Sequence, residues 1–158
     1  MGTRRWSALQ LTLVVITVAG LAVDAYVHFH LASTFENNKT STLSEADLFR
    51  LEASAAVVAG VAVLLRPRRY TAGLAFLVAA AGTAAVVVYR YVDVGAFGPF
   101  PDMYDPFWAP AEKTISLFAE IAATLSALAL LFVLHARRHD TGRAVQTQRS
   151  GRAAQMSG

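Results

Sequence analysis

The sequence contains no cysteine, and only 16% of its 158 residues are charged. Without cysteine the chain cannot form a disulfide, a thiolate metal site, an iron–sulfur cluster or a covalently attached c-type haem. The few charges stand against 55% apolar residues and a mean hydropathy of +0.43, which excludes an ordinary water-soluble domain. Soluble catalytic motifs are also absent, because the sequence has no phosphate loop, no G-x-S-x-G elbow, no H-E-x-x-H and no dinucleotide fingerprint. Any activity must therefore be sought within a membrane.

The apolar residues fall into four long blocks, at about residues 9–31, 45–65, 70–91 and 111–134. Each block is close to the roughly 20 residues that a helix needs to cross about 30 Å of hydrocarbon. We therefore predict an all-α fold, an integral membrane four-helix bundle over residues 1–137, followed by a disordered basic tail at residues 138–158. A cleaved signal peptide is the alternative for the first block, but its apolar run continues past any plausible cleavage site and three more spans follow.

The basic residues indicate how the bundle is oriented. Ten of the fourteen lie at the ends that an even number of spans places together, namely Arg4, Arg5, Arg66, Arg68, Arg69, Arg137, Arg138, Arg143, Arg149 and Arg152. By the positive-inside rule both termini should be cytoplasmic. We expect a multi-pass protein of the plasma (inner) membrane of a bacterium, whose partner is the lipid bilayer rather than nucleic acid. Small residues at 55–60 and 79–82 leave open a homodimer or membership of a larger membrane complex.

Four ionisable residues interrupt the apolar blocks: Asp24, His28, Glu52 and Glu120. Charged groups are costly in lipid and usually face the interior of a bundle. Counted from the nearest outer end of each block, three of these residues lie at a depth of roughly 10 to 14 Å, so we expect them to share one layer. Asp24 and His28 are four residues apart and share a helix face, whereas His30 points elsewhere.

Other polar residues should surround this layer. Asp47 and Arg50, three residues apart, are expected to form a separate ion pair nearer the surface. The residues expected to support the layer are Glu45, Arg90, Glu112 and Ser116.

Three interpretations of the layer stay open. One imidazole and several carboxylates suit a divalent ion such as zinc, manganese or iron(II). The same groups could handle protons, or Arg90 or Arg50 could neutralise the acids in a purely structural network. A b-type haem is not expected, because His135 and His139 lie at the opposite end from His28 and His30.

The sequence therefore favours a small membrane protein that binds a divalent metal ion or handles protons. The alternatives are a non-catalytic accessory subunit of a larger complex and a metal-dependent membrane oxidoreductase acting on a lipid or quinone. Catalytic residues cannot be named, and whether the protein is an enzyme is open.

The segment of residues 94–110, here the aromatic loop, is dense in aromatic residues, prolines and acids. Trp and Tyr favour the headgroup zone of a membrane, so interfacial anchoring is one interpretation. The loop also joins Arg90 to Glu112, which suggests a lid over the polar layer.

Overall fold

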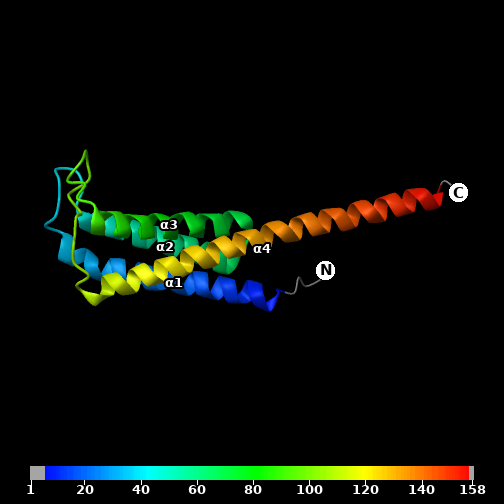
Figure 1. The fold of residues 1–158 in the computed structure, drawn as a ribbon, viewed down its shortest axis with the longest axis horizontal. Coiled ribbons are helices and arrows are strands. Elements are labelled where there is room, and N and C mark those ends of the chain that lie inside the picture. The colour runs from blue at the N-terminus through cyan, green and yellow to red at the C-terminus, as the bar shows by residue number, and fades with distance from the viewer. Residues whose placement is uncertain (1–5, 157–158) are drawn as a thin grey trace.

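The computed structural model describes the backbone of residues 6–156 and the side chains of residues 6–136. It is all-helical, with α1 at Ala8–Ala32, a short 3-10 helix η1 at Ser33–Phe35, α2 at Glu45–Leu65, α3 at Arg69–Tyr91 and α4 at Ala111–Met156 (Figure 1). Within the described chain, all four α-helices are long and apolar enough to span a membrane. The prediction of an all-α fold with four helices long and apolar enough to cross a membrane is therefore confirmed.

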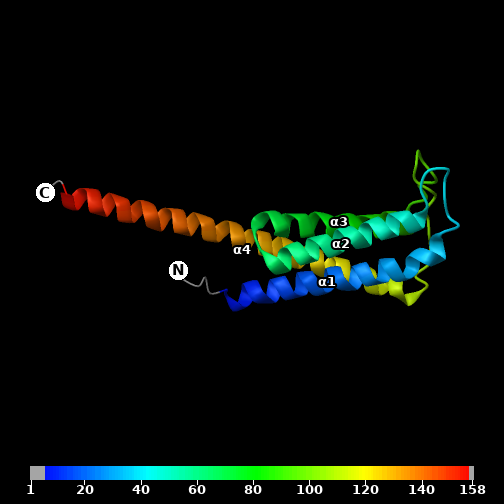
Figure 2. The ribbon, with the colours of Figure 1, turned by 180° about the vertical axis from the view of Figure 1, so that it is seen from behind.

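The helices form an up-and-down bundle in which neighbours in sequence are neighbours in space. Extensive packing joins α1 to α2, α2 to α3, α3 to α4 and α4 back to α1, whereas α1 and α3 lie diagonally and touch little. The α2–α3 turn lies at the end where α1 begins (Figures 1 and 2). The connections at residues 36–44 and 92–110 lie together at the opposite end, here called the loop end.

Small side chains fill the interior of the bundle. The fully buried alanines are Ala46, Ala53, Ala56, Ala59, Ala72, Ala75, Ala79, Ala123 and Ala127. Large apolar side chains such as Leu51, Leu65, Phe118 and Phe132 are more than 60% exposed. Helices in a membrane associate through close packing of small residues, while large apolar side chains face lipid. The small residues at 55–60 and 79–82 are used in this way, because Ala56, Ala59, Gly60, Ala79 and Gly82 are buried within the bundle.

Serine residues cap two of the helices at their N-termini. Ser7 accepts a hydrogen bond from the backbone N–H of Gln10, and Ser44 accepts one from that of Asp47. In each case the third helical residue bonds back to the cap, which satisfies two otherwise unpaired N–H groups. These capping boxes explain why α1 begins at Ala8 and α2 at Glu45.

The last helix extends well past the bundle. Its backbone is helical to Met156 and projects beyond the ends of the other helices (Figure 1), whereas the sequence predicts a disordered tail from residue 138. Residues 137–156 are rich in Ala, Arg and Gln, which have high helix propensity, and they contain no proline that would end the helix. This difference concerns the backbone alone, because the side chains of the tail lie outside the described residues.

The two connections at the loop end are tied to each other and to the bundle. The Thr40 hydroxyl donates to the carbonyl oxygen of Pro99 at 2.9 Å, and the Asn38 amide donates to that of Asp102 at 2.6 Å. The backbone N–H of Asp105 donates to the carbonyl oxygen of Tyr89 at 3.0 Å, which holds the aromatic loop against the end of α3. The aromatic loop is therefore docked onto the bundle.

Candidate functional site

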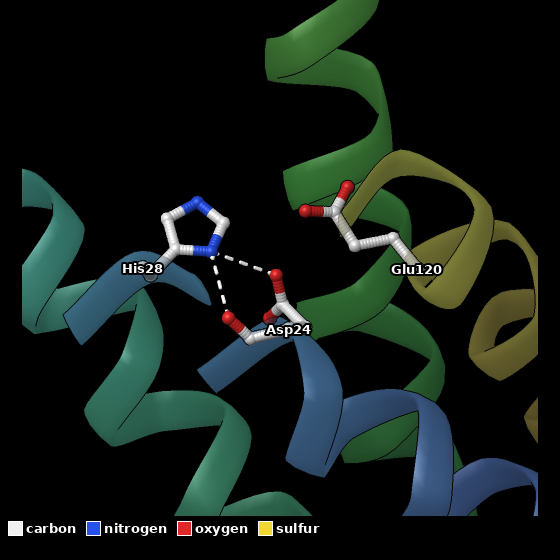
Figure 3. A group of neighbouring side chains, drawn as sticks. All are labelled: Asp24, His28 and Glu120. Carbon is white, nitrogen blue, oxygen red and sulfur yellow. Dashed lines mark hydrogen bonds and ion pairs between the residues drawn. The ribbon is translucent and has the colours of Figure 1, made fainter. Parts of the chain in front are cut away.

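Asp24 and His28 form the first half of a buried polar cluster, and both project from one face of α1 (Figure 3). Nδ1 of His28 lies 2.8 Å from Oδ1 of Asp24 and 3.1 Å from the Asp24 carbonyl oxygen. The Asp24 side chain is fully buried and that of His28 is 11% exposed. His28 also packs edge-on against the Phe49 ring, with 5.0 Å between ring centroids. The imidazole is thus fixed by its own helix and by α2.

Glu120 on the neighbouring helix α4 points toward this pair and is fully buried (Figure 3). Ser116, one turn earlier on α4, lies between the acids: its hydroxyl is 2.9 Å from Oδ1 of Asp24 and 3.3 Å from Oε1 of Glu120. One ligand atom from each of Asp24, His28 and Glu120 can be chosen so that all lie within 4.8 Å of one another. The sequence expectation that α1 and α4 bring these residues together agrees with this geometry.

Glu52 on α2 completes the acid–histidine cluster, which we define as Asp24, His28, Glu52 and Glu120. A Cβ built on Gly82 of α3 would lie 3.1 Å from Oε1 of Glu52 and 3.2 Å from Oε2 of Glu120. Both carboxylates therefore face the same small residue. Because the glycine has no side chain, α3 leaves the space into which the two acids point.

No lysine or arginine neutralises this cluster among the side chains of residues 6–136. Arg50 instead pairs with Glu36 at 2.6 Å and Asp47 at 3.6 Å, as predicted for the Asp47–Arg50 pair. Arg90 lies over the rings of Tyr91 and Trp108, at 5.1 Å from each ring centroid, and Lys113 pairs with Asp105. The interpretation in which Arg90 or Arg50 neutralises the acids is therefore wrong, because both guanidinium groups are directed to partners at the loop end.

Three acid oxygens are consequently left without a hydrogen-bond partner in the described part of the chain. They are Oδ2 of Asp24, Oε1 of Glu52 and Oε2 of Glu120, and all three are buried. A buried carboxylate oxygen without a donor is unfavourable, so a proton, a cation or water must compensate it. The orphaned oxygens point to a group that the chain itself does not supply.

A cavity of about 420 Å³ lies between the cluster and the aromatic loop. His28, Glu52 and Ser116 border it on the cluster side, and Arg90 and Lys113 border it nearer the loop end. The aromatic loop contributes Phe97, Phe100, Met103, Asp105, Phe107 and Trp108 to the lining. This placement agrees with the lid interpretation of the loop, because its side chains close the cavity at the loop end.

The supporting residues predicted from the sequence are only partly brought together. Ser116 joins two acids directly, and Arg90 and Glu45 line the cavity. Glu45 accepts a hydrogen bond from Asn38 at 2.6 Å, so it also anchors a connection at the loop end. Glu112 lies outside the cavity lining and forms no hydrogen bond or ion pair with other described residues, which fits a role at the positive N-terminal end of α4.

His30 is exposed and stacks on Tyr26, with 5.9 Å between ring centroids. The prediction that it points away from His28 is confirmed.

Several residues that build the site were not identified from the sequence. The sequence gives a signal for Gly82, because this residue belongs to a run of small residues, but the run does not show which of its members faces the acids. The sequence gives no such signal for Asn38 and Lys113, since their partners depend on how the loops fold. Outside the site, two turns from Asp24, the contact that Thr17 makes between α1 and α4 could have been found: Thr17 lies seven residues before Asp24 on the same face of α1, and its hydroxyl is 2.8 Å from that of Ser126 on α4.

Comparison of the chain with protein-family models, curated proteins and solved structures gives no match in any of the three. The function must therefore be argued from the site alone.

Proposed function

We propose that the acid–histidine cluster binds a divalent metal ion inside a membrane-spanning helix bundle. The observation that carries this proposal is the convergence of Asp24, His28 and Glu120 within 4.8 Å, together with three buried carboxylate oxygens that have no donor among the described residues. Zinc is held at about 2.0–2.2 Å by imidazole nitrogen and carboxylate oxygen, so a modest approach of these side chains would complete a coordination sphere.

The donor set narrows the choice of metal. One nitrogen with carboxylate oxygens suits zinc, manganese or iron(II), and the lack of sulfur ligands disfavours copper(I). A divalent ion would also compensate the negative charge that no nearby lysine or arginine offsets. In this proposal Asp24, His28, Glu52 and Glu120 are the ligands, and Ser116 orients Asp24 and Glu120 by hydrogen bonding.

Proton handling by the same residues is the second candidate, and the position of Ser116 favours it. The serine hydroxyl has a single hydrogen but lies within 3.3 Å of both an Asp24 and a Glu120 oxygen. A proton on one carboxyl group would satisfy the contact that the hydroxyl cannot serve. Such a site would sit in a multi-pass protein of the bacterial plasma membrane with cytoplasmic termini.

The test is elemental analysis of protein purified gently in detergent, in the unmodified form and as variants. We expect about one ion per chain. The ion should be lost in Asp24→Asn and Glu120→Gln, because each substitution replaces a charged ligand with a neutral amide of similar shape. Substitution His28→Ala should weaken retention by about tenfold or more, as the loss of one ligand does.

Two matched controls accompany these variants. His30→Ala removes the neighbouring exposed histidine, and Glu112→Gln removes an acid of α4 outside the cluster, so both should retain the ion. Unmodified protein that carries no zinc, manganese or iron, and binds none of them when each is added, would refute the metal site and leave the proton-handling candidate.

A further inference from the structure

The cavity beside the cluster has features of a ligand site that the cation proposal does not use. Its volume of about 420 Å³ lies within the range of about 300–1,000 Å³ typical of small-molecule sites. Among the lining residues, Leu51 of α2 and Ala81 and Ala85 of α3 are exposed. The cavity therefore opens between α2 and α3, on a side that would face lipid.

Polar groups meet the cavity at two levels, separated by apolar walls. Arg90 lies one residue from the loop end of α3, and its Nε is buried without a hydrogen-bond partner. Glu52 lies seven residues into α2 from the same end and has an unpartnered Oε1. At about 1.5 Å per residue the two backbone positions differ by roughly 9 Å in depth. Their side chains can thus reach toward a small ligand from opposite ends.

The charges at these two levels limit the chemistry of the ligand. Lys113 is paired with Asp105 and Glu45 accepts from Asn38, whereas Arg90 and Glu52 each hold a buried polar atom without a hydrogen-bond partner among the described residues. Arg90 can only donate, and an ionised Glu52 can only accept. A ligand that satisfies both needs an acceptor oxygen at one end and a donor at the other, without a net charge.

The aromatic side chains of the lining favour a ring. Phe97, Phe100 and Trp108 of the aromatic loop line the cavity at the loop end, and Phe49 of α2 lines it nearer Glu52. Aromatic side chains pack well against a planar ring, with ring centroids 4.5–7 Å apart. A fatty acid or alcohol could fill the space but carries one polar end, which would leave Arg90 or Glu52 unpaired at a cost in binding energy.

We propose that this cavity binds a membrane-soluble ring compound with oxygen functions at opposite ends, of the prenylated quinone and quinol class. In the quinol form one oxygen accepts from Arg90, the opposite hydroxyl donates to Glu52, and the apolar chain leaves between α2 and α3 into the lipid. The quinone form has a carbonyl in place of that hydroxyl, so it accepts from Arg90 and leaves Glu52 unpaired. The site shares His28, Glu52 and Ser116 with the cluster but does not require a bound ion.

Tryptophan fluorescence can report on this site directly. The chain has two tryptophans, and Trp6 lies before α1 at the opposite end of the bundle, so Trp6→Phe leaves Trp108 in the cavity lining as the sole reporter. We titrate this single-tryptophan protein in nanodiscs with a short-chain prenylated benzoquinone and with its quinol. We expect saturable quenching of Trp108 emission by the quinone, and displacement of the quinone by the quinol.

Matched variants locate the binding. Ala85→Phe fills the opening and should weaken binding by at least tenfold, whereas Ala84→Phe, one residue earlier on an exposed face outside the lining, should leave it unchanged. Arg90→Gln should weaken binding of both forms by about tenfold, whereas Glu52→Gln should weaken binding of the quinol alone by about tenfold, as expected for loss of one hydrogen bond to a charged group.

Quenching that rises linearly without saturation, equally in the protein with Ala85→Phe, would overturn the proposal by showing mere partition into lipid. Displacement of the quinone by lauric acid at equal concentration would also overturn it, since the cavity would then recognise only an apolar chain; this measurement needs no cavity variant. Metal content is determined on the same samples, so failure of quinone binding and failure of the cation site are recorded separately.

Discussion

Substitution of Gly20 by alanine tests how closely α1 approaches α4 beneath the cluster. A Cβ at Gly20 would lie 2.6 Å from the carbonyl oxygen of Ala119 and 2.9 Å from Cβ of Ala123. Neither contact can be relieved by a side-chain rotation, because one atom is backbone and the other is the only side-chain carbon of an alanine. The two helices must therefore separate until the nearest atoms are about 3.4 Å apart, where ordinary contact begins.

Three contributions set the change in the free energy of unfolding. Alanine is favoured over glycine in a helix interior by about 1 kcal/mol, whereas overpacking of a tight contact costs about 1–3 kcal/mol. Asp24 lies one turn from Gly20, so separation of the helices also stretches the 2.9 Å hydrogen bond between Ser116 and Asp24. Loss of such a bond to a charged group is worth about 1.5–3 kcal/mol. We expect a net loss of about 2–4 kcal/mol in the free energy of unfolding.

Gly73→Ala is the matched control, because a Cβ at Gly73 meets nothing within 4 Å. That substitution should stabilise the protein by up to about 1 kcal/mol through helix propensity alone. Unfolding is followed by circular dichroism as SDS replaces a mild detergent, and the two variants should shift the transition in opposite directions. If Gly20→Ala resists SDS as well as Gly73→Ala does, the close approach of α1 to α4 is refuted.

Two further predictions concern the bridging serine and the orientation of the bundle. Ser116→Ala removes the hydroxyl between Asp24 and Glu120 and should lower the free energy of unfolding by about 1–3 kcal/mol in the same SDS titration. An equal loss in Thr114→Ala, which removes a hydroxyl of α4 that forms no hydrogen bond with the described residues, would argue against a bridging role. If both termini are cytoplasmic, a cysteine at Asp102 should react with an impermeant thiol reagent on intact cells while one at Pro67 stays protected, and the reverse pattern would invert the proposed orientation.

The fold could be predicted largely from the distribution of apolar residues. The spans expected at about 9–31, 45–65 and 70–91 lie within one residue of α1, α2 and α3 at each end. Local signals account for this agreement, since Ser7 and Ser44 cap helices and Pro67 lies in the turn between α2 and α3. The helical backbone of residues 138–156 was not expected, because low hydrophobicity removes the drive to pack but not the helix propensity of the residues.

The site was predictable where helix geometry alone decides which side chains meet. Asp24 and His28 share a face because they are four residues apart, and the same rule separates His30 from them. The partners of Arg90 were not predictable in this way. Its guanidinium lies over Trp108 because the aromatic loop folds back onto the bundle, and that arrangement depends on hydrogen bonds between segments about 60 residues apart.

The alanine-filled interior has a consequence for how this bundle can move. A core of leucine and phenylalanine can absorb a perturbation by changing rotamers, but the methyl group of alanine has no rotamer to change. Only a few larger side chains, among them the buried Leu21 and Leu130, can absorb a rearrangement at the cluster, so much of it is passed on as displacement of whole helices. Such a displacement would affect α4 most, because this helix carries Ser116 and Glu120 within the bundle and continues beyond the bundle to Met156 (Figure 1). If a shift of about one ångström at the cluster tilts this continuous helix, its far end moves by several times that distance, so a change at the buried polar site would alter the position of the helix well beyond the bundle.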